Sequence, residues 1–113
     1  MNIDAVLESL VGFAENDWIG LWLIVADVAD ELAVGDSQAQ LEATVAVVRG
    51  LLRRGFLAGE SPVRSSVHFV AWPDQDPDAV VDLIRRQWAG NADYPAWGDC
   101  PWFAAPRTTR LDA

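Results

Sequence analysis

The chain has one histidine, His68, and one cysteine, Cys100, the residue types that most often serve as nucleophile, base or metal ligand. A zinc site needs three or four ligands, which two distant residues do not supply. The acid Asp99 beside Cys100 opposes formation of a thiolate. An enzyme would need a pocket that joins His68, Cys100 and an acid. We expect instead a structural strand histidine and a buried, inert cysteine.

Three acids at alternate positions, Asp74, Asp76 and Asp78, have the opening spacing of a calcium loop. Such a loop also needs a glycine and a bidentate acid further on, where this chain has Ala79 and Arg85. These acids instead suit the start of a helix, where the helix dipole favours negative charge. Phosphate-binding loops and nucleophile elbows are also missing from the sequence. The sequence thus predicts a non-enzymatic chain with no metal and no cofactor.

Asp27, Asp30 and Glu31 form a second acidic group, within a predicted helix. Asp27 and Glu31 are one turn apart and therefore share a face. Burial would let them shift each other's pKa. The alternatives are a solvated face, a face that docks a partner, and a catalytic or metal-binding role.

The charge of the chain is distributed unevenly. The 113 residues include 17 acids and eight basic residues, all of them arginine, and the net charge is −9. Nine of the acids precede the first base, Arg49. A surface of this kind repels phosphate backbones and attracts basic proteins. The alternative is that the acids serve solubility alone.

Six tryptophans are many for a chain of this length. Three of them, Trp72, Trp88 and Trp102, are expected in the core. The others are candidate anchors, because tryptophan is favoured in interface hot spots. For Trp22, packing in the core is at least an equal alternative. Together with nearby acids they give the candidate partner-binding residues: Asp17, Trp18, Trp22, Asp27, Asp30, Glu31 and Trp97.

Apolar periodicity and turn residues predict an α+β fold. The expected helices cover 4–14, 18–33, 37–54 and 77–90, and the expected strands cover 56–58, 67–72 and 100–104. The spacing of Ser37 and Gln40 suggests a capping box for the third helix. We expect a single domain over 1–106, in which the apolar tail 91–106 packs on the body or serves recognition, and a frayed end over 107–113.

Three helices followed by a hairpin, with the junction Leu51-Leu52-Arg53-Arg54-Gly55-Phe56-Leu57, resemble a winged-helix domain. The resemblance covers residues 4–72. It implies DNA binding through the third helix, and the candidate DNA-contacting residues would be Arg49, Arg53, Arg54 and Arg64. The first half of that helix carries no base. We therefore do not expect nucleic acid as a partner.

The later part of the chain carries three recognisable segments, which are Trp72-Pro73, Trp88 and Gly98-Asp99-Cys100-Pro101-Trp102-Phe103. In these segments it resembles a group of short uncharacterised bacterial proteins, which look like accessory or immunity-type proteins.

These observations lead to a functional hypothesis. We expect a cytoplasmic, acidic protein-binding module, an immunity or antitoxin-like inhibitor of a basic, nuclease-type partner, with no membrane association. The alternative is a winged-helix transcription regulator that works as a dimer or through a partner. The sequence leaves a homodimer open.

Overall fold

The computed structural model describes residues 3–14, 18–32, 36–60, 71–90 and 100–105. These residues form the helices and strands of an α+β fold. In chain order the elements are α1 (Ile3–Ala14), β1 (Ile19–Gly20), α2 (Leu21–Leu32), α3 (Ser37–Arg53), β2 (Leu57–Gly59), α4 (Pro77–Gly90) and β3 (Trp102–Ala104).

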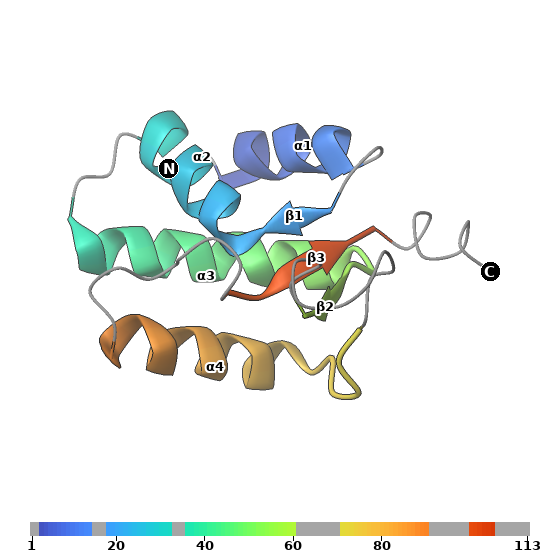
Figure 1. Ribbon diagram of the computed structural model, residues 1–113. Helices are drawn as coiled ribbons and strands as arrows, with labels where there is room; N and C mark the ends of the chain where they lie inside the picture. The colour runs from blue at the N-terminus through green and yellow to red at the C-terminus, as the bar shows by residue number, and fades with distance from the viewer. Residues whose placement is uncertain (1–2, 15–17, 33–35, 61–70, 91–99, 106–113) are drawn as a thin grey trace.

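The long helix α3 is the centre of the fold. In Figure 1, α1 and α2 lie on one side of α3 and α4 lies on the other. Its buried residues therefore surround much of the helix: Leu41, Ala43, Thr44, Val45, Val47, Val48 and Leu51. A helix that is buried on several sides offers little free surface for recognition.

Both ends of α3 are closed by hydrogen bonds that its sequence supplies. At the start, the Asp36 carboxylate accepts a bond from the Ala39 amide at 3.0 Å, so the N-cap lies one residue before the predicted Ser37. At the end, Gly55 has φ 91°, a conformation that glycine adopts without strain. The Gly55 amide donates to Leu52 and the Phe56 amide to Leu51, which is the Schellman arrangement.

The small antiparallel sheet has the order β1-β3-β2, with the last strand in the middle. Phe103 of β3 lies opposite Ile19 of β1 on one side and Ala58 of β2 on the other. The second helix was predicted to begin at Trp18, but it begins at Leu21 because Ile19 and Gly20 pair with β3. The expected strand over 100–104 is confirmed as β3, which lies in the core.

The predicted hairpin between 56–58 and 67–72 is only partly present. The regular partner of β2 is β3, and Ala71 makes an isolated bridge to Gly59. The Trp72 amide also donates to the Ala58 carbonyl at 3.0 Å. The chain therefore returns to the free edge of β2, but the described part of it forms no paired strand there. Residues 61–70, with Arg64 and His68, lie outside the described residues.

Among the described residues, the core joins α1, α2, α3 and α4 to the sheet. Its fully buried side chains include Val6 and Leu10 of α1, Ile24 of α2, Ile84 of α4 and Phe103 of β3. Each large apolar side chain buried in this way contributes roughly 1.5–3 kcal/mol. The core thus fixes the direction in which each helix presents its exposed face.

The tryptophans expected in the core differ in burial. Trp102 is buried, whereas Trp72 and Trp88 are half-buried and pack against the core from its edge. Each of these two has a polar contact: the Trp72 indole donates to Glu60 at 3.3 Å and the Trp88 indole to Ser37 at 3.2 Å. This is common for tryptophan, whose indole N–H seeks an acceptor at the edge of a core.

Candidate protein-interaction site

Helix α2 has one face in the core and one face directed outward. Leu21, Ile24 and Val28 are fully buried on the inner side. The outer side, here called the α2 face, consists of Trp22, Leu23, Ala26, Asp27, Asp30 and Glu31. These six residues form two neighbouring rows with a spacing of four, Trp22-Ala26-Asp30 and Leu23-Asp27-Glu31, which together make up the outward half of the helix.

The two ends of the α2 face differ in chemistry. Its first turn holds the half-buried side chains of Trp22 and Leu23, followed by the exposed Ala26. Its last turns hold Asp27, half-buried, and Asp30 and Glu31, both exposed. An apolar anchor beside a charged rim is the usual composition of a protein interface.

The position of Trp22 is set by Gly20. A Cβ at residue 20 would lie 2.5 Å from the Trp22 indole nitrogen and 3.0 Å from Trp102 Cε2. Only glycine leaves room for the indole there. The Trp22 indole N–H is buried and has no hydrogen-bond partner within the described residues. Trp22 is therefore held by packing, and the residue as a whole is half-buried.

The three carboxylates of the α2 face repel one another. The pKa of Asp27 is raised, and burial is the largest cause. The negative charge of Glu31 is the next largest cause, and that of Asp30 is the third. This is the mutual effect expected from their spacing. Asp30 and Glu31 also lie in the last turn, where the helix dipole disfavours negative charge. Within the described residues none of the three has a hydrogen-bond or ion-pair partner.

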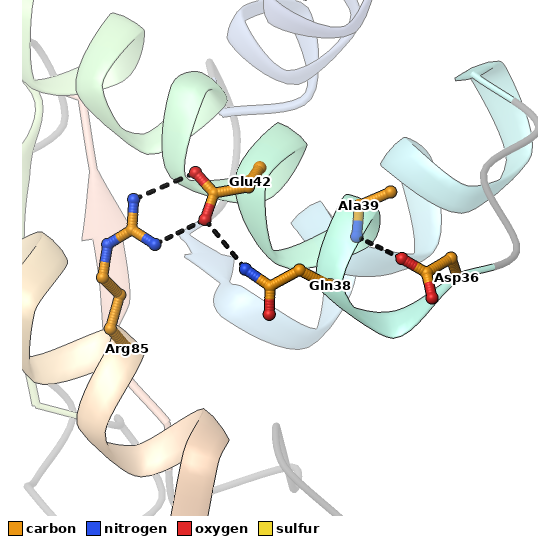
Figure 2. Close-up of polar contacts among 5 residues, drawn as sticks. All are labelled: Asp36, Gln38, Ala39, Glu42 and Arg85. Carbon is orange, nitrogen blue, oxygen red and sulfur yellow. Dashed lines mark hydrogen bonds and ion pairs between the residues drawn. The ribbon is translucent and has the colours of Figure 1, made fainter.

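Several carboxylates elsewhere in the fold have an arginine partner. Glu42 accepts two bonds from Arg85 at 2.6 and 3.1 Å and a third from Gln38 at 3.2 Å (Figure 2). This pairing lowers the pKa of Glu42, with the hydrogen bond from Arg85 as the first cause, and it raises the pKa of Arg85. Asp27 on the α2 face, which has no partner within the described residues, therefore has a raised pKa, whereas the paired Glu42 has a lowered one.

Two of the three arginines in and just after α3 pair with acids of neighbouring helices. Arg49 pairs with Asp78 of α4 at 2.7 Å, and Arg54, just after the helix, pairs with Glu8 of α1 at 3.4 Å. Arg53 is exposed. Paired guanidinium groups must give up a carboxylate before they bind a phosphate. This arrangement weakens the case for α3 as a DNA-reading helix.

Helix α4 lies along one side of α3, and the two run antiparallel. Three polar contacts join them in order: Ser37 with Trp88, Glu42 with Arg85, and Arg49 with Asp78. Val80, Val81 and Ile84 of α4 are buried beneath these contacts. The side of α3 that faces α4 is thus closed to a ligand.

Of the residues considered for catalysis or metal binding, the structure describes Asp74, Asp76, Asp78 and Cys100, whereas His68 lies outside the described residues. Asp76 precedes α4 and accepts a bond from the Asp78 amide at 3.4 Å, while Asp74 accepts one from the Asp76 amide at 3.0 Å. Cys100 is buried. Over the described ranges, no three histidine, cysteine or acidic side chains are grouped so as to hold a metal ion.

The structure describes two of the three tryptophans that were predicted as interface anchors. Trp18 and Trp22 are both half-buried against the core, next to α2 rather than fully exposed. Asp17 and Trp97 lie outside the described residues. The structure adds Phe13 of α1, whose side chain is 47% exposed. Phe13 follows Val6 and Leu10 at helical spacing, so the sequence alone gives no sign that it is exposed.

Comparisons with known protein families, curated proteins and solved structures find no significant match to the chain. In the part of the chain that the structure describes, no helix has both the length and the apolar character that crossing a bilayer requires.

Proposed function

We propose that the chain is a non-enzymatic protein-binding module that uses the α2 face. One observation carries the proposal: the half-buried Trp22 lies in one row with Asp30 on the outward half of α2, and Asp27 and Glu31 form the neighbouring row. The three acids have no partner within the described residues. Such an arrangement costs stability in the free chain, because like charges lie together at the negative end of a helix. A basic partner would remove that cost on binding.

The chemistry of the α2 face defines the partner. A surface of lysine and arginine would pair with the three carboxylates, and a pocket beside it would take the edge of Trp22. Proteins that hold phosphate, such as nucleases, present basic surfaces of this kind. We therefore propose an immunity or antitoxin-like inhibitor that covers the basic surface of a nuclease-type partner.

The kinetics of such binding follow from the net charge of −9. Opposite charges steer two proteins together and raise the association rate, and salt weakens that steering. The proposal thus predicts fast association that slows as salt is added, and a dissociation rate governed by the packing of Trp22.

For the architecture we propose a relationship to winged-helix domains. Two features support it: a short strand between the first and second helices, and its pairing with the last strand of a sheet ordered β1-β3-β2. Helix α4, inserted between β2 and β3, sets this chain apart. The pairing of Arg49 and Arg54 with acids argues against the regulator alternative as a direct DNA binder.

The test compares three versions of the full chain as bait in a lysate of the source cells. The first is wild type, and the second carries Asp27→Asn, Asp30→Asn and Glu31→Gln. The third is a charge-matched control with Asp4→Asn, Glu60→Gln and Asp82→Asn, which changes exposed acids elsewhere.

A basic protein retained by wild type and control, lost with the α2 variant and released by high salt would support the proposal. Equal retention by all three baits would show that the wrong face is assigned. Retention of nucleic acid alone would favour the regulator.

A further inference from the structure

We propose that a groove between residues 72–74 and α4 binds a linear peptide segment in which a large apolar side chain stands between a basic and an acidic residue. This site is separate from the α2 face, since α2 and α4 lie on opposite sides of α3 (Figure 1). The inference does not depend on the proposed inhibitor function.

The groove has an apolar surface and a volume of about 300 Å³. Trp72 and Pro73 form one wall, and Ala79, Val80 and Leu83 of α4 form the other. This volume is at the lower end for small-molecule sites, so it suits one anchoring side chain. The exposed Pro73 and Ala79 leave the groove open, which suits a chain that passes across it.

The groove is formed in advance, because hydrogen bonds fix its Trp72 wall. The Trp72 amide donates to Ala58 at 3.0 Å, and its indole donates to Glu60 at 3.3 Å. The side-chain Nε2 of Gln75 donates to the carbonyls of Trp72 and Ala58, both at 2.8 Å. Gln75 also accepts from the Ala58 amide at 2.7 Å. The wall therefore needs no ordering on binding, which lowers the cost of association.

Opposite charges at the rim define the ligand. Asp74 and Arg86 both line the groove. The Arg86 Nε pairs with Asp82 at 3.1 Å, and within the described residues its two Nη groups have no partner. The Nη groups of Arg86 can donate to a carboxylate of the ligand, and the Asp74 carboxylate can accept from a lysine or arginine of the ligand. A ligand with one charge of each sign around an apolar residue complements both.

The probes are three capped synthetic peptides with the central sequences Lys-Phe-Glu, Glu-Phe-Lys and Gln-Phe-Gln. Binding to the full chain is followed by the NMR signals of the Trp72 indole, Ala79 and the Leu83 methyl groups. We expect one charged order to bind about two- to fivefold more tightly than Gln-Phe-Gln, the range of an exposed ion pair. The variant of the α2 face, Asp27→Asn, Asp30→Asn, Glu31→Gln, is the control and should bind the same peptide as tightly as the wild type does.

A charge swap makes the test specific. The double variant Asp74→Arg, Arg86→Asp should prefer the opposite order of charges. Ala79→Trp, which fills the groove from an exposed position, should abolish the shifts while circular dichroism stays unchanged. Equal affinity for all three peptides, or an unchanged preference in the swap variant, would overturn the proposal. Equally tight binding of N-acetylphenylalanine amide alone would identify a small-molecule site and overturn it too.

Discussion

The carboxyls of Asp27 and Glu31 lie one helical turn apart on α2, and the charge of Glu31 adds to burial in raising the pKa of Asp27. Asp30 adds to the same repulsion. A fold gains nothing from this arrangement, because none of the three has a compensating partner among the described residues. Residues that cost stability are often kept for function. This is why the α2 face carries the functional proposal.

Neutralising these acids should therefore stabilise the free chain. The variant Asp27→Asn, Asp30→Asn, Glu31→Gln is expected to raise the free energy of unfolding by about 1 kcal/mol at neutral pH. Urea denaturation would measure it. The control Asp4→Asn, Glu60→Gln, Asp82→Asn should give no such gain, since Asp4 lies at the favourable end of α1 and Asp82 has a partner.

The pH dependence of that gain has a definite sign. The folded-state pKa of Asp27 is raised above the ordinary value of 3.8, so between these two values the folded state binds more protons than the unfolded state. The free energy of unfolding must then fall as pH rises through this window. The stability gain of Asp27→Asn alone should grow across the window and stay constant above it. A gain that shrinks as pH rises would contradict the assigned cause.

The Glu42–Arg85 pair should show the opposite dependence. Because the pKa of Glu42 is lowered below 4.5, its contribution to stability is present above that value and is lost as pH falls through the folded-state pKa. Glu42→Gln should lower the melting temperature slightly at neutral pH and have no effect in acid. In a double-mutant cycle with Arg85→Gln, the coupling should disappear at high salt. A coupling that persists there would contradict an exposed ion pair.

The two phenylalanines at opposite extremes of burial give a matched test of the core. Phe103 is fully buried between β1 and β2, so Phe103→Ala should cost about 3–5 kcal/mol. Phe13 is 47% exposed, so Phe13→Ala should cost about 0.5 kcal/mol or less. Urea denaturation of both variants would measure these losses. Similar losses at the two positions would mean that the tail strand is not part of the core.

Gly20 links the sheet to the α2 face. Gly20→Ala should cost about 1–3 kcal/mol, because its Cβ would lie 2.5 Å from the Trp22 indole. It should also shift the Trp22 indole NMR signal and weaken partner binding without any change of charge. The control is Gly12→Ala in α1, where a Cβ meets nothing within 4 Å and stability should rise slightly.

Local signals in the sequence predict much of this fold. The period and the closing Gly55 place α3 within one residue of its observed end, and Asp76-Pro77 places the start of α4. The strand β1 was missed because Ile19 and Gly20 continue an apolar helix pattern, and only their pairing with β3, far along the chain, makes them a strand. The partner of β2 was missed for the same reason.

Some features of the candidate sites could likewise be predicted from the sequence, and others could not. The shared face of Asp27 and Glu31 follows from helical spacing and could be predicted. The engagement of Arg49 by Asp78 could not, because it depends on how α4 packs along α3. The groove at Trp72 likewise arises from Gln75 and its bonds to β2, which no local pattern encodes.

The most direct test of the central claim is the association rate with the basic protein that the wild-type bait retains, measured by stopped flow over a range of salt concentrations. Neutralising Asp27, Asp30 and Glu31 should slow association about tenfold or more at low salt and flatten its salt dependence. The control at Asp4, Glu60 and Asp82 should retain most of the wild-type rate. Equal rates for the two variants at every salt concentration would contradict the claim that the α2 face binds the partner.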